Sequence, residues 1–458
     1  MKISRHLFIL LSLLAVALSQ APLNAITVQE NKAEINFPET ITFSLEANSS
    51  STITAVRLEF GTDALACGES VSRAIPDDFE PNTEIDVEWA WNLRRTGAAP
   101  PGTEIWWRWI LENEAGEEIE TPTQRLIFLD DFIPWRTRES DHLSLYWYEG
   151  SDQFADTLLQ AGEDALVRLY QMAGVTVTNP VRIYIYASSQ EMQAATLFAP
   201  DWSGGLAFPW YSTILIGVAP YDIGYGLDTI AHELSHVLIG HHTFSCVNST
   251  PYWIDEGLAM VTEGDLDAYL EERLQEGVDD NSLLSVREVG QIFSANPDLA
   301  LLAYAESFSL VSYLLETYGD EPMLELLEHF KQGKSEDTAM EEVYGFNRDG
   351  LEVRWREWLG AAPMEEGSGQ EGKPTATLVP TLAPIVGPTI MASHTPAEPV
   401  IDATADTSNM DQEGVPEGES QGDRVQVNPV LLASIGGGFL LIVGLVVFLK
   451  AKREQQDL

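Results

Sequence analysis

The stretch Ala231-His232-Glu233-Leu234-Ser235-His236 decides the fold of the central part of this chain. Apolar residues recur around it at helical spacing and predict an amphipathic helix with Gly240 as its stop; they are Leu227, Ile230, Ala231, Leu234 and Leu238. Residues four apart share one side of a helix and lie roughly 6 Å apart along its axis. His232 and His236 can therefore present two imidazoles to one metal ion.

Glu233 stands one position round the predicted helix from the first histidine. A general base must reach a metal-bound water without occupying the metal, and this offset allows it. The pattern His-Glu-x-x-His on a helix is typical of zinc sites with such a base. Asp228, one turn before His232, has two interpretations: it orients that side of the site, or it favours the helix start.

A second motif, Trp253-Ile254-Asp255-Glu256-Gly257, follows at the distance that a third ligand needs. Thr250 and Pro251 form a helix-start signal, because a capping residue is followed by proline at the first helical position. This signal places Glu256 on the next helix, facing the first one, and Gly257 leaves room for close helix packing. Glu256 is thus the candidate third ligand.

The two motifs resemble those of the gluzincin metallopeptidases, and more narrowly those of the bacterial peptidase MA-like group. That group shares the Trp-x-x-Glu-Gly-Leu-Ala pattern found at residues 253–259 and a downstream Tyr-x-x-Ser helix, here from Tyr304 to Ser307. The resemblance covers roughly residues 135–360. It implies one Zn²⁺ ion held by His232, His236 and Glu256, with a water as fourth ligand and Glu233 as general base.

The resemblance also implies an oxyanion donor and an edge strand that aligns the substrate backbone. Tyr304 is the candidate donor, although with Phe308 and Val311 it also fits a plain core stripe. The β-branched run Thr213–Val218 is the candidate edge strand. The Gly-x-Met-Glu-Asn segment of the related aminopeptidases is missing, and its nearest counterpart is Gly204-Gly205-Leu206-Ala207, so selection for a free amino terminus is not predicted.

His242 competes with Glu256 for the third position of the metal site. It stands six residues after His236, where a metzincin places its third histidine, but the glycine that metzincins need three residues after His236 is Ile239 here. The gluzincin arrangement with Glu256 is therefore favoured, and His241 and His242 are interpreted as a polar helix end.

Residues 26–132 are expected to form short strands, as in the alternation Ile85-x-Val87-x-Trp89-x-Trp91. This pattern favours an all-β sandwich of immunoglobulin or fibronectin type. Its many tryptophans fit a packed core better than a carbohydrate platform. The expected strands are Ala33–Phe37, Thr40–Ala47, Ile53–Phe60, Glu84–Leu93, Glu104–Asn113, Glu117–Thr121 and Arg125–Leu129.

Residues 135–360 are expected to form an α+β catalytic domain that is mixed in its first half and helical in its second. Strands are predicted at Val181–Tyr186 and Thr213–Val218. The predicted helices are Asp152–Ala173, Ser188–Leu197, the site helix from Leu227, Pro251–Glu263, Leu301–Tyr318, Pro322–Lys331 and Leu351–Leu359.

The two ends of the chain predict export and anchoring. A basic start and a short apolar run favour a signal peptide over residues 1–25. The uncharged run Val430–Leu449, followed by lysine and arginine, predicts one transmembrane helix with the tail 450–458 in the cytoplasm. Residues 361–428, rich in proline, threonine and glutamate, predict a disordered stalk that holds the folded domains outside the membrane.

The formal net charge of -46 argues against nucleic acid as a partner, since phosphates would be repelled. Only two cysteines are present, Cys67 and Cys246. They form either one disulfide between the amino-terminal domain and the loop after the histidine motif, or two buried thiols.

Together these features predict a membrane-anchored zinc metallopeptidase that acts on a peptide or protein outside the cell membrane. Two alternatives stay open: a non-catalytic surface binding protein with a structural metal, and a zinc hydrolase of another amide or ester. The partner of the β-sandwich is not predicted.

Overall fold

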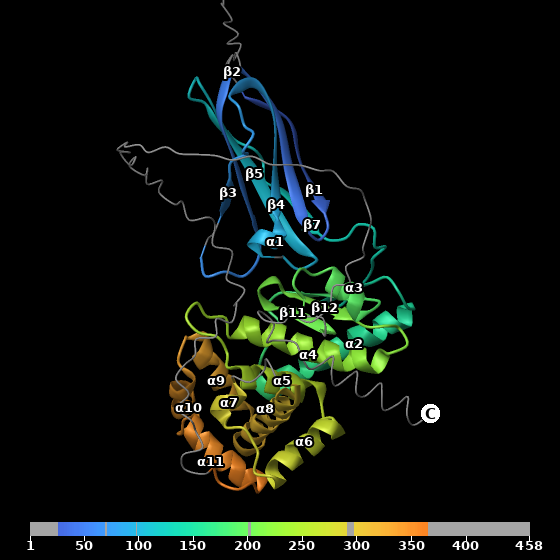
Figure 1. Cartoon of the computed structure of the whole chain (residues 1–458), viewed down its shortest axis with the longest axis vertical. Coiled ribbons are helices and arrows are strands. Elements are labelled where there is room, and N and C mark those ends of the chain that lie inside the picture. Colours follow the sequence, from blue (N-terminus) through green and yellow to red (C-terminus); the bar gives the residue numbers. More distant parts are fainter. Residues whose placement is uncertain (1–25, 69–70, 98, 200–202, 291–296, 365–458) are drawn as a thin grey trace, which may run out of the picture.

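The structure is a computed structural model that describes residues 26–364, except 69–70, 98, 200–202 and 291–296. Figure 1 shows a β-rich part stacked along the long axis on a mixed part, whose far end is helical. The predicted signal peptide (1–25) and transmembrane helix (430–449) lie outside the described residues, as do the tail and nearly all of the stalk. The predicted domain boundaries stay predictions.

The β-rich part is an antiparallel sheet of seven strands: β1 (Thr27–Asn36), β2 (Thr40–Thr62), β3 (Ser72–Ala74), β4 (Asn82–Asn92), β5 (Thr103–Asn113), β6 (Glu118–Glu120) and β7 (Gln124–Phe128). The short helix α1 (Leu93–Thr96) follows β4. Strand β2 pairs with β1 and β4 along its first half and with β3 and β5 along its second. The immunoglobulin-like sandwich stays a prediction.

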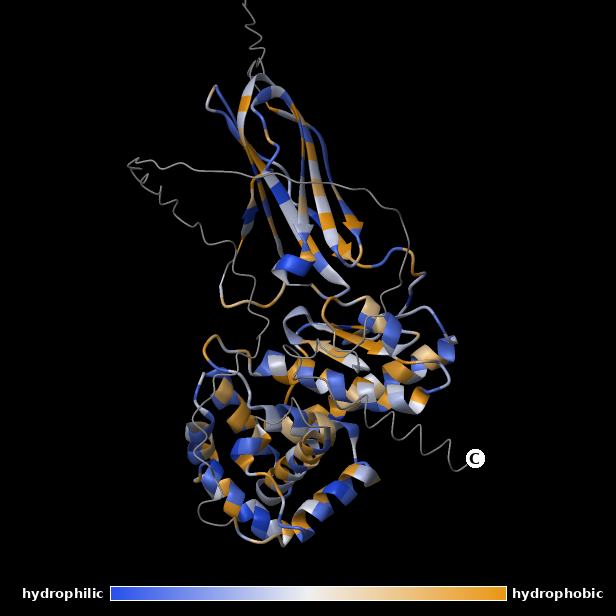
Figure 2. Ribbon diagram, in the orientation of Figure 1, coloured by the Kyte–Doolittle hydropathy of each residue, from blue (hydrophilic) through white to orange (hydrophobic). Residues whose placement is uncertain are grey.

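The prediction of two separate strands, Thr40–Ala47 and Ile53–Phe60, was wrong, because β2 runs through both. The register of its pairing with β4 shifts between Asn48 and Ile53, so the chain changes neighbours there without leaving the extended conformation. Packed tryptophans are confirmed: Trp91 is 2% exposed and Trp109 fully buried. Figure 2 shows polar and apolar residues alternating along these strands, as expected for a sheet with one buried face.

The second sheet has five strands in the order β11 (Gly205–Phe208), β12 (Thr213–Gly217), β10 (Val181–Tyr186), β9 (Leu143–Trp147) and β8 (Arg136–Glu139). The three inner strands are parallel, and both outer strands are antiparallel to their neighbours. The prediction that Thr213–Val218 is the edge strand was wrong. Strand β11 covers it, since the glycine-led stretch before it turns back and pairs along its whole length.

Helices pack against this sheet and then fill the rest of the molecule (Figure 1). They are α2 (Asp152–Ala173), α3 (Ser189–Ala194), η1 (Pro209–Tyr211), α4 (Ile223–His242), α5 (Tyr252–Glu263), α6 (Ala268–Asp279), α7 (Val286–Val289), α8 (Pro297–Tyr318), α9 (Asp320–Lys331), α10 (Glu336–Tyr344) and α11 (Arg348–Leu359). The predicted helices are confirmed, whereas α6, α7 and α10 were missed.

Within the described ranges, α8 alone is long and apolar enough to cross a membrane, but 72% of its most apolar window is buried, as in a core helix.

Gly240 does not stop the site helix, contrary to the prediction, because α4 continues to His242. Its role is packing: a Cβ atom on Gly240 would lie 2.6 Å from the Cβ of Pro209 in η1. The bare glycine surface therefore lets η1 rest directly on α4.

One disulfide joins the two parts of the molecule. Cys67, in the loop after β2, is bonded to Cys246, in the loop between α4 and α5. Close by, the backbone N–H of Leu65 donates a hydrogen bond to the carbonyl of Trp210 at 2.8 Å. Of the two alternatives for the cysteines, the structure has the disulfide.

The crossing of α5 and α8 gives a first prediction. A Cβ on Gly257 would lie 2.4 Å from the carbonyl oxygen of Ser307, so Gly257→Ala must push the two helices apart. We expect a loss of about 1–3 kcal/mol in the free energy of unfolding, measured by urea denaturation. Gly224→Ala is the matched control, because no atom lies within 4 Å of its added Cβ and alanine favours a helix. Equal stability of the two variants would contradict the packing argument.

Candidate active site

Two helices bring three potential ligands together. His232 and His236 lie on α4, and Glu256 lies on α5. Their candidate ligand atoms all lie within 4.8 Å of one another. The Nε2 atoms of the two histidines are 3.1 Å apart, and Glu256 Oε2 lies 3.5 Å from one and 3.6 Å from the other.

The outer ring nitrogens of both histidines have carboxylate partners. Glu263 Oε1 lies 2.5 Å from Nδ1 of His232, and Asp255 Oδ2 lies 3.0 Å from Nδ1 of His236. A carboxylate accepts the proton that such a nitrogen carries, so each Nε2 is left as a bare electron pair that faces the centre. Sequence reasoning did not assign these two partners a role. The sequence indicates the position of Glu263 only weakly: it follows Glu256 by two helical turns and so lies on the same face of α5.

This arrangement fits a metal cation. Two imidazole lone pairs and a carboxylate oxygen point at one position, and they repel one another unless a positive charge lies between them. Glu256 Oε2 is buried and has no hydrogen-bond partner among the described residues. An unpaired buried carboxylate oxygen is costly, and coordination of an ion would satisfy it.

The same acidic surroundings act on the protonation of the histidines. Burial lowers the pKa of His232, but the carboxylates of Glu256 and Glu263 beside it outweigh this effect and raise the pKa well above its usual range. For His236, burial is likewise outweighed by the negative charges of Asp255 and Glu256, which raise its pKa to about 9. The site therefore favours positive charge, whether as a proton or as a cation.

Glu233 lies between the metal-ligand group and the edge of the sheet. It is 3% exposed, and burial raises its pKa, although the two histidines oppose this. A Cβ on Gly205 would lie 2.5 Å from Glu233 Oε1, so strand β11 approaches this carboxylate through a glycine. Strand β11, which begins at Gly205, is thus the edge strand at the site, a place that we predicted for Thr213–Val218.

Tyr304 reaches the site from α8 and is 6% exposed. Burial raises its pKa well above its usual range, and the charges of Glu256 and Glu233 raise it further. The hydroxyl therefore keeps its proton and is able to donate a hydrogen bond.

The competing histidines lie elsewhere. His242 Nε2 is 3.3 Å from Glu328 on α9, and His241 Nε2 donates to the carbonyl of Pro209 at 2.5 Å. Asp228 does not mark the helix start, because α4 begins five residues earlier at Ile223. The interpretation as a polar helix end holds for His241 and His242, which are the last two residues of α4.

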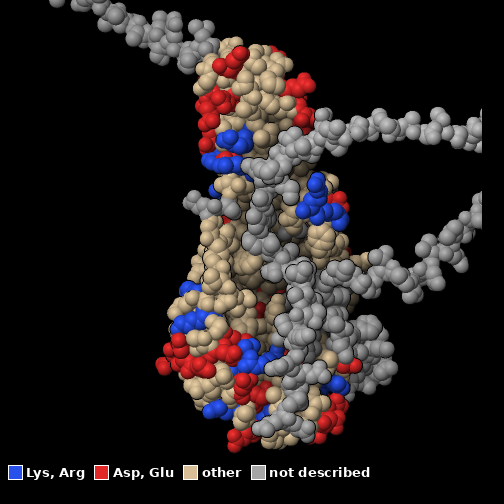
Figure 3. Space-filling model, turned by 60° about the vertical axis from the view of Figure 1, so that its left-hand side comes forward, with Lys and Arg blue, Asp and Glu red and all other residues tan. Residues whose placement is uncertain are grey.

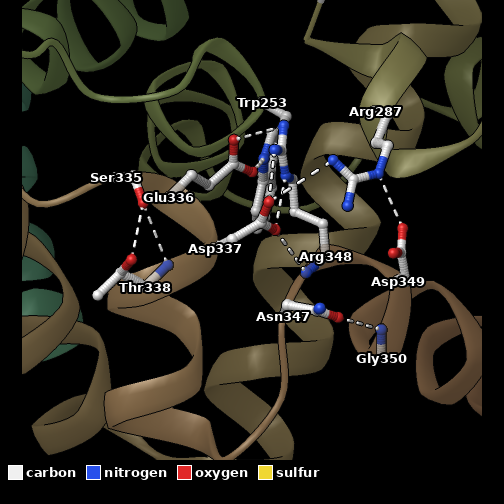
Figure 4. A network of polar contacts seen from close by, with 10 residues as sticks. All are labelled: Trp253, Arg287, Ser335, Glu336, Asp337, Thr338, Asn347, Arg348, Asp349 and Gly350. Atoms are coloured by element: carbon white, nitrogen blue, oxygen red, sulfur yellow. Dashed lines mark hydrogen bonds and ion pairs between the residues drawn. The ribbon is translucent and has the colours of Figure 1, made fainter.

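A polar network holds the start of α5 from below (Figure 4). The indole N–H of Trp253, one turn before Glu256, donates to Glu336 Oε1 at 2.7 Å. Arg348 binds both Glu336 and Asp337, at 3.2 and 2.7 Å. The tryptophan of the second motif therefore fixes the helix that carries Glu256 to α10 and α11.

Comparisons with known proteins agree with the motifs. Residues 161–361 match the family model of the Peptidase MA superfamily. A search of the curated proteins found no match.

Two of the similar solved structures are the M1 zinc metallopeptidase from Deinococcus radiodurans and a point mutant of it. The first is 12% identical, covers 74% of this chain and 94% of its own, and has a TM-score of 0.29. The mutant is 11% identical, with coverage of 74% and 96% and a TM-score of 0.30. A putative polysaccharide deacetylase from Bacillus anthracis is 12% identical, covers 38% of this chain and 54% of its own, and has a TM-score of 0.16. The matched segment contains the candidate site and both motifs, so the resemblance of this segment to the Peptidase MA superfamily is confirmed.

Proposed function

We propose that this protein is a zinc-dependent peptidase held outside a cell membrane by the helix predicted at 430–449. His232, His236 and Glu256 hold one Zn²⁺, Glu233 is the general base, and Tyr304 is the oxyanion donor. The observation that carries the proposal is the convergence of three electron pairs backed by Glu263 and Asp255.

Zinc, when bound there, would polarise the scissile carbonyl and lower the pKa of its water toward neutrality. Glu233 takes a proton from the attacking water and passes it to the leaving amine nitrogen. The raised pKa of Glu233 suits this exchange, because the carboxylate then holds the proton more readily before it passes the proton to the amine. Tyr304 donates a hydrogen bond to the oxygen on which negative charge develops.

Strand β11 supports a peptide as the substrate. It is the edge of the five-stranded sheet and passes directly beside Glu233 at Gly205. Its outer backbone groups are able to pair with an extended chain, which is a common way of holding a peptide. This arrangement suits a peptide better than a small ester.

The general base gives a second prediction. Glu233→Gln keeps the shape of the side chain but cannot accept a proton, so we expect zinc binding to persist while peptide cleavage falls by about 10²–10⁴-fold. Zinc is measured by competition with a chelating dye, and cleavage by mass spectrometry of a digested peptide library. Glu271→Gln, an exposed residue of α6, is the control. Equal cleavage by Glu233→Gln and the wild type would point to a non-catalytic binding protein.

The outer carboxylates give a third prediction. Glu263→Ala removes the acceptor of His232 Nδ1, which lets the ring turn and protonate at the ligand nitrogen. We expect zinc affinity to drop by about 10–100-fold in the chelator competition. Glu272→Ala changes the same side chain at an exposed position of α6 and should leave the affinity unchanged.

Tyr304 gives a fourth prediction. Tyr304→Phe removes one hydroxyl donor, so we expect kcat to fall by about 10²–10³-fold while KM and zinc affinity change little. Tyr313→Phe, on the same helix with its hydroxyl against Tyr318, is the matched control. Equal kcat values for these two variants would contradict a catalytic role for Tyr304 and would leave it only a role in core packing.

A further inference from the structure

One tryptophan of the β-rich part lies outside its core. Side chains alternate along β5, so Trp107 and Trp109 are buried in the core while Trp106 lies on the outer face of the sheet and is half-buried. Within the part of the chain that the structure describes, the Trp106 indole makes no hydrogen bond, ring contact or cation–π contact. Its ring and its N–H donor are therefore available to a ligand.

The indole of Trp106 lies along the sheet. Gly61 of β2 stands directly opposite Trp106 in the antiparallel pairing. A Cβ on Gly61 would lie 2.9, 3.0 and 3.1 Å from the indole atoms Cζ2, Cε2 and Nε1. The far edge of the indole thus covers the neighbouring strand, and the bare surface of the glycine is what lets it rest there.

Arg125 of β7 stands opposite Trp106 on the other side of β5. Its Nη1 lies 2.6 Å from Asp63 Oδ2 and also binds Glu104. These ion pairs fix the guanidinium beside the ring, and among the described residues they use only Nη1. The Nε and Nη2 donors stay free, and each carboxylate keeps acceptor lone pairs. This side of Trp106 thus offers fixed donors and acceptors.

A second set of ion pairs lies further along β5. Arg108, two residues after Trp106 on the same face, binds Glu59 Oε2 through Nη2 at 2.7 Å. Arg73 of β3 binds the other oxygen of this carboxylate at 2.9 Å. Together with Trp106 and Gly61, the ion-paired residues form what we call the Trp106 face; they are Arg57, Arg73, Arg108, Arg125, Glu59, Asp63, Glu104 and Glu120.

The Trp106 face is balanced in charge. Its four arginines match its four carboxylates, although the whole chain has 71 acidic and only 25 basic residues. A surface without net charge attracts neither a polyanion nor a polycation. The face therefore suits a neutral ligand that is rich in hydrogen-bonding groups.

A polar cavity adjoins the Trp106 face. It has a volume of about 160 Å³ and lies between the β-rich part and the peptidase segment, and its lining includes Asp63 and Glu104, the two partners of Arg125. Arg182 of β10 lines it from the other side, with its Nη2 donating to the carbonyl of Tyr211 at 2.6 Å. This volume admits several waters or a polar group of a ligand.

We propose that the Trp106 face binds a neutral polysaccharide. A pyranose ring has a flat side of C–H groups, which stacks on an indole, and hydroxyl groups around its edge, which pair with carboxylate and guanidinium groups. Trp106 provides the stacking surface, Arg125 and Glu104 bind the hydroxyls, and the cavity takes a neighbouring part of the sugar chain. The site belongs to the β-rich part, so it is independent of the proposed peptidase activity.

Two other classes of ligand fit less well. Nucleic acid requires a surface of net positive charge, which the balanced Trp106 face lacks. A proline-rich peptide docks in a groove lined by several aromatic rings, which a single indole does not form.

The test is isothermal titration calorimetry of the full-length protein with neutral hexasaccharides of glucose, of mannose and of N-acetylglucosamine. A heparin hexasaccharide and decaproline are the probes for an anionic ligand and for a proline-rich peptide. We expect at least one neutral hexasaccharide to bind. Its affinity should be nearly equal at low and high salt, because the Trp106 face has no net charge to be screened.

Variants of Trp106 identify the stacking surface. Trp106→Ala should weaken binding by about tenfold or more, since stacking on the ring is lost. Trp106→Phe keeps a smaller ring and should give an affinity between those of Trp106→Ala and the wild type. Trp358→Ala is the matched control, because Trp358 is 42% exposed on α11, far along the chain from this face. Urea denaturation shows that each variant is folded.

A glycine variant tests the support of the ring while keeping the indole. The Cβ of Gly61→Ala would meet the indole at 2.9 Å and lift it from the sheet, so we expect weaker binding than in the wild type. Gly68→Ala is its control, because no atom lies within 4 Å of the added Cβ.

Three outcomes would overturn the proposal. The first is a wild-type protein that binds none of the neutral hexasaccharides. The second is binding of heparin or decaproline alone, which would assign the Trp106 face to another class of partner. The third is equal affinity of Trp106→Ala and the wild type, which would place the sugar elsewhere on the molecule.

Discussion

The structure of this protein depends on the convergence of three electron-pair donors from two different helices. Neither α4 nor α5 is able to make the site alone, since His232 and His236 supply two groups and Glu256 supplies the third. The position of Glu256 in turn depends on how closely α5 approaches its neighbours. Gly257 allows contact with α8, and Trp253 fixes the beginning of α5 to the last helices of the domain.

The carboxylates around the site lie at two distances from its centre. Glu256 faces the centre directly, while Glu263 and Asp255 act through the outer nitrogens of the two histidines. The outer carboxylates hold the rings of His232 and His236 in one orientation, and together with Glu256 they make the centre attractive to a cation. On the molecular surface, Figure 3 shows acidic side chains gathered on the tip of the β-rich part and on the helical part. The carboxylates of the site are buried and belong to a separate arrangement.

The elements that could be predicted from the sequence are those set by residues close together in the chain. The spacing of apolar residues around His232 and the proline before α5 are local signals, so both helices and all three candidate ligands were identified. The predicted cap itself was wrong, because Pro251 is the N-cap of α5 rather than its first residue, and the Thr250 hydroxyl donates to Thr243 instead. Strand β11 was missed because four residues led by glycine carry no periodic pattern, and its identity as an edge depends on pairing with β12. Gly240 was misread for a related reason, since a glycine that ends a helix and one that admits a neighbour look alike in sequence.

The long strand β2 and the carboxylates of Glu263 and Asp255 were also missed, because both depend on contacts between residues far apart in the sequence. The change of neighbours near Asn48 is decided by β4 and β5, which come later in the chain. The contact between Glu263 and His232 spans two helices, and the acidic residues of this chain are too numerous for one to stand out.

The disulfide joins Cys67 and Cys246, which are 179 residues apart in the sequence. The covalent loop that it closes contains the whole connection between the β-rich part and the peptidase segment. A single cut of the backbone anywhere inside this loop leaves both fragments covalently joined. Such a nick does not release the β-rich part from the rest of the molecule. The bond thus gives the molecule tolerance to damage in the connecting loops as well as a fixed arrangement of its two parts.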